Sequence, residues 1–143
     1  MTADAGRVPA SAWAADAAAR ERGRVQMFNA GRPGGLDGWT MDAGQYELMR
    51  EHILRTLEDD ADDDGTVLLG HLVSTAQARF GAHPAFPGGR LRNYCTYTKV
   101  DLEARGLIER VPGRGPQRVR LVRGDGPEQA NGTAGRPAGQ PPT

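Results

Sequence analysis

Arginine and lysine side chains gather in the C-terminal third of the sequence, where they could bind a polyanion. Nine basic residues stand against three acidic ones between positions 89 and 123. Between positions 42 and 64 the balance is reversed, with nine acidic and two basic residues. The net charge of the whole chain is zero, so the asymmetry is local. It favours a polyanionic partner for the basic part of the chain.

Four of these arginines lie on or beside an expected β-hairpin. Residues 107–111 and 117–122 have the composition and alternation of two strands, and the Pro- and Gly-rich residues 112–116 form the turn between them. Arg118 and Arg120 are two positions apart, so their side chains leave the second strand on the same face. The alternative to phosphate binding is a solvated edge hairpin whose charges discourage aggregation. The arginines open to both interpretations are Arg110, Arg114, Arg118 and Arg120.

The expected helix before this hairpin, over residues 91–105, offers side chains that could contact bases. One stripe of the helix is apolar and should face the core: Leu91, Cys95, Thr98 and Leu102. On the remaining surface, Asn can pair with adenine, Arg with guanine, and Thr with a base edge or a thymine methyl. When a helix binds in the major groove of DNA, its N-terminal end normally meets the bases. The DNA contacts predicted here are Arg90, Arg92, Asn93, Thr96, Tyr97 and Lys99.

The same helix also fits a protein partner. Tyr97, Val100 and Ala104 form a mildly apolar stripe, and Asp101 and Glu103 would repel phosphates. The stripe suits another protein or a second copy of the chain as well as it suits DNA. Charge geometry separates the two interpretations. Hairpin arginines that share a face with the arginines of the helix N-terminus would favour DNA, whereas a surface interrupted by the two carboxylates would favour protein contact.

Groups of residues suited to catalysis or metal binding are not found. His52, His71 and His83 lie on different expected elements without ligand spacing, and we expect them at the surface or in loops. Cys95 falls on the core stripe and is expected to be a small buried hydrophobe with no base beside it. The acidic run at 58–64 lacks the alternating ligands, central glycine and closing glutamate of an EF-hand. We therefore expect no enzyme activity, no metal and no cofactor.

Composition indicates one small domain in a reducing compartment. Cys95 is the only cysteine, whereas a secreted domain of this size would normally contain disulfides. No run approaches the roughly 18 apolar residues of a membrane span, and no signal peptide is recognised at the N-terminus. A cytoplasmic protein without membrane contact is the expectation.

Glycine and proline divide the chain into four segments. Residues 1–23 are Ala-rich and charged, and a helix over 12–22 would have no apolar stripe to dock, so this segment is expected to be disordered or loosely helical. Residues 24–41 could form a β-hairpin. Residues 42–123 form the folded domain. Residues 124–143 contain nothing to bury and are expected to be disordered.

Helix signals are strong from residue 42 onward. Asp42 suits an N-cap, Gln45 completes a capping-box arrangement, and Met41 with Tyr46 has hydrophobic-staple spacing. An apolar stripe follows, and the acidic run ends this helix. A short β-prone run comes next at 66–68, and then apolar residues recur at helical spacing up to Phe80.

Helix, short strand, two helices and a basic hairpin are the elements of a winged helix-turn-helix, an α+β fold of three helices with a C-terminal β-hairpin wing. Residues 99–110 resemble the end of the recognition helix and the first wing strand of many bacterial winged-helix regulators. More narrowly, residues 42–120 resemble a small bacterial family of stand-alone winged-helix-like proteins of unknown function. The matching pieces are residues 46–54, 86–89 and 101–112.

This resemblance implies the fold and brings no activity with it. Our first hypothesis is a small transcriptional regulator that binds double-stranded DNA. The basic wing would bind phosphates, and the helix before the wing would bind bases. The alternative is an interaction module that uses its apolar helix stripe to form a homodimer or to bind a partner protein.

Overall fold

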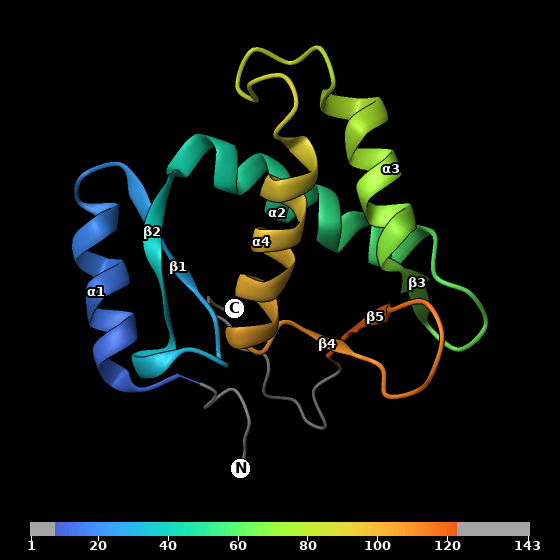
Figure 1. The fold of residues 1–143 in the computed structure, drawn as a ribbon, viewed down its shortest axis with the longest axis horizontal. Coiled ribbons are helices and arrows are strands. Elements are labelled where there is room, and N and C mark those ends of the chain that lie inside the picture. The colour runs from blue at the N-terminus through green and yellow to red at the C-terminus, as the bar shows by residue number, and fades with distance from the viewer. Residues whose placement is uncertain (1–7, 123–143) are drawn as a thin grey trace, which may run out of the picture.

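The computed structural model describes residues 8–122, so the expectations for residues 1–7 and for the tail at 124–143 lie outside it. Figure 1 shows the arrangement of the elements. Among the described residues, no helix has the length and apolar character needed to cross a membrane. In chain order the elements are α1 (Ala10–Arg20), β1 (Arg24–Phe28), the 3-10 turn η2 (Pro33–Gly35), β2 (Leu36–Asp42), α2 (Ala43–Asp59), β3 (Thr66–Leu68), α3 (Leu69–Phe80), α4 (Leu91–Ala104), β4 (Ile108–Arg110) and β5 (Arg118–Leu121).

α1, β1 and β2 form an N-terminal layer beside the C-terminal half of α4 (Figure 1). β1 pairs antiparallel with β2, which confirms the expected hairpin. α1 is a regular helix that docks on this hairpin, although its sequence has no apolar stripe. Ala12 and Ala19 are fully buried in the contact, because side chains this small let two backbones approach closely. The packed unit therefore begins before the residue 42 boundary expected from the sequence.

α2 begins where the capping residues indicated. The Asp42 carboxylate accepts a hydrogen bond of 3.0 Å from the Gln45 backbone N–H, which satisfies one donor of the first turn. Met41 and Tyr46 are buried in the same apolar cluster, as the staple spacing predicted. The Gln45 side chain does not complete the capping box and instead donates to the Ala85 carbonyl. This bond ties the start of α2 to the loop between α3 and α4.

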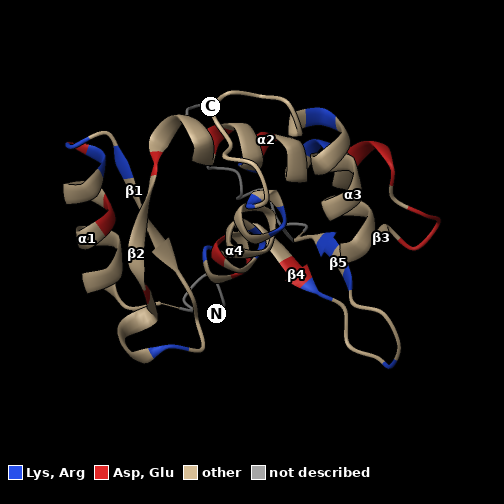
Figure 2. Ribbon diagram, turned by 45° about the horizontal axis from the view of Figure 1, so that its top comes forward, with Lys and Arg blue, Asp and Glu red and all other residues tan. Residues whose placement is uncertain are grey.

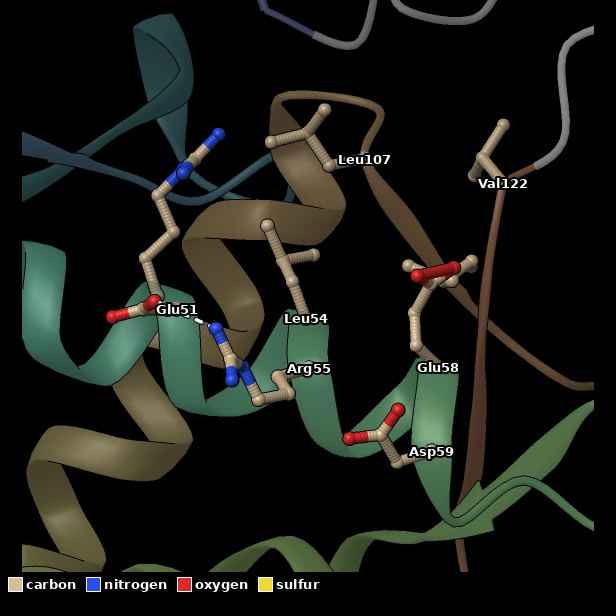
Figure 3. Close-up of a pocket in the computed structure, with 9 residues that line it drawn as sticks. Glu51, Leu54, Arg55, Glu58, Asp59, Leu107 and Val122 are labelled. Carbon is tan, nitrogen blue, oxygen red and sulfur yellow. Dashed lines mark hydrogen bonds and ion pairs between the residues drawn. The ribbon is translucent and has the colours of Figure 1, made fainter.

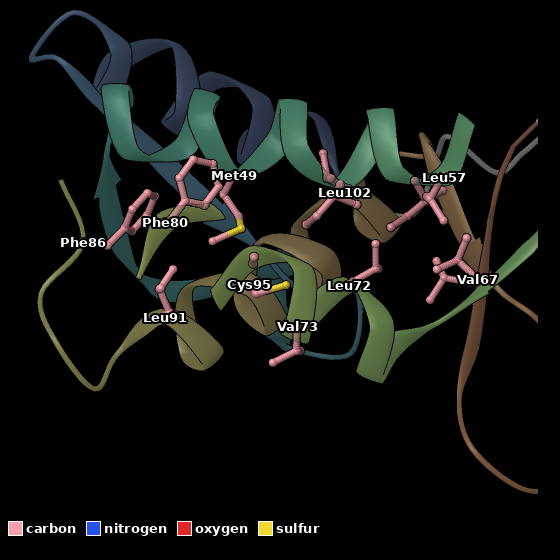
Figure 4. Packing of buried hydrophobic residues seen from close by; sticks show 14 residues of the cluster. Met49, Leu57, Val67, Leu72, Val73, Phe80, Phe86, Leu91, Cys95 and Leu102 are labelled. Carbon is pink, nitrogen blue, oxygen red and sulfur yellow. The ribbon is translucent and has the colours of Figure 1, made fainter. Parts of the chain in front are cut away.

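The main core lies between α2, α3, α4 and the three-stranded sheet (Figure 4). All four residues of the expected core stripe on α4 are buried. Phe86, from the loop before α4, inserts into the core. Its ring lies 5.1 Å from Phe80 and 5.5 Å from Tyr94, centroid to centroid.

β3, β5 and β4 form an antiparallel sheet with β5 in the middle. Val67 lies opposite Val119, and Ile108 lies opposite Leu121. Val119 and Ile108 are fully buried against the helices, whereas the neighbours of Val119 in β5 are partly or fully exposed. This alternation matches the sequence pattern, and the α+β class expected from the sequence is confirmed.

One guanidinium group joins the N-terminal layer to α4. Arg105 donates to the carboxylates of Asp101 at 2.9 Å and Asp16 at 3.1 Å, and to the Gln26 carbonyl at 3.1 Å. Its guanidinium carbon lies 4.1 Å from the centre of the Phe28 ring. Asp16 also accepts the Gln26 backbone N–H at 3.0 Å. The only apolar side chains that α1 buries fully are Ala12 and Ala19, so these charge-assisted bonds help to fix its position on α4.

Asp101 lies at the centre of this network and is fully buried, which corrects the expectation that it repels phosphates at the surface. Its carboxylate accepts the Phe28 backbone N–H at 2.8 Å and the Tyr46 hydroxyl at 2.6 Å. Burial raises the pKa of the Asp101 carboxyl, against the opposing effect of the Arg105 charge. Burial acts in the same direction on Asp16, but the hydrogen bond and charge of Arg105 outweigh it, and the pKa of Asp16 is lowered.

Candidate nucleic-acid interface

The N-terminal half of α4 presents polar and basic side chains to solvent. Arg90, Arg92, Asn93 and Tyr97 are exposed, and Thr96 is half-buried with its hydroxyl donating to the Asn93 carbonyl at 3.2 Å. The chain contains no aspartate or glutamate from residue 81 to residue 100. No carboxylate on this segment therefore opposes the approach of a phosphate backbone.

An aromatic residue from the N-terminal hairpin completes this surface. The Trp39 ring of β2 meets Tyr97 edge to face, with ring centres 5.4 Å apart. Together with Arg90, Asn93 and Tyr94 they line a hollow of about 290 Å³. Sequence reasoning missed Trp39, because nothing in the sequence placed the hairpin beside α4.

Lys99 is not available to DNA, which corrects its prediction as a DNA contact. Its side chain is buried, with the residue only 5% exposed. The ammonium group pairs with Glu103 at 3.0 Å and bonds to the Gln117 side chain just before β5. Lys99 follows Thr98 on the core side of α4, and its long stem reaches polar partners at the edge of the core. Its role is to join α4 to the β4–β5 hairpin.

The hairpin arginines have different surroundings. Arg118 lies 3.4 Å from the Asp62 carboxylate, and Arg120 lies 2.7 Å from Glu109 on the neighbouring strand. Arg114, in the turn between β4 and β5, is exposed and has no ion pair within residues 8–122. The charges of the two strand arginines are thus already balanced inside the fold, whereas the turn arginine is available to a ligand.

The acidic loop between α2 and β3 is organised by the carboxylate that pairs with Arg118. Asp62 accepts hydrogen bonds of 2.9 Å from the Thr66 backbone, the Thr66 hydroxyl and the Asp64 backbone. These bonds, those from Thr66 above all, lower the pKa of Asp62. The acidic loop therefore also orients a hairpin arginine, Arg118.

The two groups of arginines lie near opposite ends of α4. Figure 2 shows basic residues at the helix N-terminus and along β5 and its turn, with acidic residues in the α2–β3 loop. The 14 residues of α4 span about 21 Å at 1.5 Å per residue. The structure therefore does not unite the predicted contacts in one patch. It forms a helix group (Arg90, Arg92, Asn93, Thr96, Tyr97) and a hairpin group (Arg114, Arg118, Arg120).

The apolar stripe proposed for a protein partner is partly covered by the chain itself. Ala104 is fully buried in a cluster with Val8, Ala12 and Phe28 of the N-terminal layer. Val100 is half-buried beside the loop after β1, and Tyr97 is in contact with Trp39. The stripe therefore serves as an internal contact between α4 and the N-terminal layer along much of its length.

The model of a family of unknown function, DUF6958, matches residues 24–119, more than half of the chain. The chain belongs to this family. The expected membership of a family of unknown function is thereby confirmed. The matched region begins at β1 and ends within β5, so it includes the N-terminal hairpin, helices α2 to α4 and strands β3 and β4. Comparison with curated proteins and with solved structures finds no match.

The histidines and the cysteine of this DUF6958 chain have structural surroundings. His52 is buried, contrary to the expected surface or loop position, with its Nε2 atom 3.1 Å from the Thr75 hydroxyl. Burial lowers the pKa of His52. Cys95 is buried as predicted, and burial raises the pKa of its thiol to about 12. Among residues 8–122 there is no group of three or more His, Cys, Asp or Glu that could hold a metal ion.

Proposed function

We propose that the chain is a DNA-binding winged-helix protein that acts as a small transcriptional regulator. The observation that carries the proposal is the N-terminal half of α4, where exposed Arg92, Asn93 and Tyr97 lie on a segment without carboxylates. Such side chains at the N-terminal end of an exposed helix suit the major groove, where arginine and asparagine distinguish guanine from adenine.

The order of the elements supports the winged-helix assignment. From Ala43 to Leu121 the chain follows the sequence helix, strand, helix, helix, strand, strand. The last strand lies between the other two, so the final hairpin extends from the sheet beside the third of these helices. In this assignment α4 is the recognition helix, and the β4–β5 turn is the wing.

The surroundings of each arginine determine its proposed role. Arg92, with Asn93 and Thr96, would meet base edges, and Arg90 at the start of α4 would bind a phosphate. Arg114 would bind a second phosphate from the wing. Arg118 and Arg120 would have to exchange or share their carboxylate partners with DNA, so their contribution should be smaller.

Fluorescence anisotropy with a labelled random duplex tests the proposal. Arg92→Ala and Arg114→Ala should each weaken binding about tenfold at low salt, within the 1–3 kcal/mol of a good contact. The combined Arg118→Ala and Arg120→Ala variant should weaken binding less than Arg114→Ala alone. Arg22→Ala, just after α1, removes an equal charge outside both groups and should leave affinity nearly unchanged. Equal losses in all variants, or no binding, would overturn the assignment.

A further inference from the structure

A second surface, on the solvent side of α2, has the features of a protein interface. A groove of about 580 Å³ lies there, and Figure 3 shows Leu54, Leu107 and Val122 around one hollow. Leu107 is 37% exposed and Val122 is 39% exposed. The rim of the groove carries both charges: Arg50, Glu51, Arg55, Glu58 and Asp59.

The apolar surface continues past the groove toward α1. A neighbouring hollow shares Leu107 and Arg50 with it and also includes Trp13, which is 41% exposed. Three of the five large exposed hydrophobic residues in the described part of the chain thus lie along one band. Single exposed apolar residues are normal in a monomer, whereas a continuous band marks a binding surface.

The charges on α2 are arranged so that the helix complements itself. Glu58 has no ion-pair partner within residues 8–122, and Arg50 has only a long contact of 3.8 Å with Glu47. Arg50 lies four residues before Leu54, and Glu58 lies four residues after it. If two copies of α2 cross antiparallel on a two-fold axis at Leu54, each Arg50 faces the Glu58 of the other copy.

We propose that this groove binds a second copy of the chain, in a two-fold dimer centred on Leu54. The leucines and Val122 of the two copies form the apolar centre of the interface, and two Arg50–Glu58 pairs close its rim. A rim with both signs favours a copy of itself over a uniformly basic or acidic partner. The proposal does not depend on DNA binding, because the dimer leaves α4 exposed. If DNA is bound, two α4 helices would meet two half-sites.

Charge reversal tests the register of the pairing in the full-length chain. In analytical ultracentrifugation, Arg50→Glu and Glu58→Arg should each weaken dimerisation at least about tenfold, since each creates two like-charge contacts. The double variant should recover most of the wild-type affinity, because it restores both pairs with the signs exchanged. Arg92→Glu on α4 is the matched control: it should dimerise normally whether or not it binds DNA.

A chain that stays monomeric at about 100 µM, or a dimer that ignores both single reversals, would overturn the proposal. Leu54→Cys gives a second readout that does not depend on the reversals. Cys95 is buried, so Cys at 54 would be the reactive thiol, and oxidation should produce a covalent dimer across the axis. Ser74→Cys, on the exposed side of α3, should give no covalent dimer under the same conditions. Equal cross-linking of the two cysteine variants would also contradict the proposed interface.

Discussion

Arg105 joins two buried carboxylates, Asp101 of α4 and Asp16 of α1. Removing it would leave Asp101 fully buried without its cationic partner and would also release Asp16 from α4. We predict that Arg105→Met lowers the free energy of unfolding by about 3–5 kcal/mol, the usual effect of breaking a buried ion pair. Urea denaturation followed by circular dichroism measures this loss.

Arg20 provides the control for that experiment. It also pairs with Asp16, at 2.9 Å, but its side chain is 44% exposed. Arg20→Ala should therefore cost less than about 1 kcal/mol. Similar losses from the two variants would mean that the buried network does not hold the N-terminal layer in place.

His52 should make the stability of the fold depend on pH. Burial lowers the pKa of His52 in the folded chain, so folding favours the neutral ring. The stabilisation is complete above the unfolded pKa of about 6.5 and is lost as the pH falls through the lowered folded value. One such proton contributes at most about 1.4 kcal/mol per pH unit. His52→Gln should flatten the decline in the free energy of unfolding between about pH 7 and pH 5; an unchanged slope would assign the dependence to other groups.

At the residue scale, the sequence predicted contacts between residues that are close together in the chain. Asp42 was predicted as a cap because its partner Gln45 lies three residues away. The positions of Asp101 and Lys99 could not be predicted, because their partners lie far away in the sequence. Asp101 accepts a hydrogen bond from the Phe28 backbone N–H, and the Lys99 ammonium group donates one to the Gln117 side chain. On an isolated α4 helix, the side chains of Asp101 and Lys99 would both be exposed to solvent.

At the element scale, docking of the N-terminal layer depends on the turn before β2. Gly34 and Gly35 both have positive φ, at 69° and 75°. A Cβ on Gly35 would lie 2.5 Å from Val8 Cγ1, whereas a Cβ on Gly34 would meet nothing within 4 Å. Gly34→Ala should cost about 1–2 kcal/mol for the backbone conformation alone. Gly35→Ala should cost about 1–3 kcal/mol more because of the overpacking.

Thermal unfolding of the two variants separates these contributions. Equal melting temperatures would mean that the segment around Val8 is not packed against the turn. Near-UV circular dichroism reports on Trp13, whose ring meets Phe28 at 5.0 Å, and should change only in the Gly35 variant.

α2, α3 and α4 were predictable because each carries a long apolar stripe at helical spacing. The docking of α1 was not, because its contact surface is built from Ala12, Ala19 and the charged Asp16. Hydrophobic periodicity does not detect a helix held by small residues and an ion pair. The contribution of β2 to the candidate interface was not predictable either, because nothing in the sequence places Trp39 beside α4.

At the scale of the whole molecule, the basic groups proposed for DNA and the apolar band lie on different elements. The basic helix and hairpin groups lie near the two ends of α4, and the apolar band follows the solvent side of α2. A dimer through α2 and DNA contacts through α4 could therefore coexist. Net charge predicted neither surface, because opposite charges at different places in the fold cancel in the total.

The salt dependence of duplex binding tests DNA recognition most directly. Two to four arginines at phosphates should give a slope of log binding constant against log salt between about −2 and −4. Wild-type chain titrated with a labelled random duplex from about 50 to 200 mM salt supplies the measurement. A slope in this range, made shallower by about one in Arg114→Ala, is the result that the account predicts. Absence of binding at the lowest salt, or binding that does not change with salt, would contradict it.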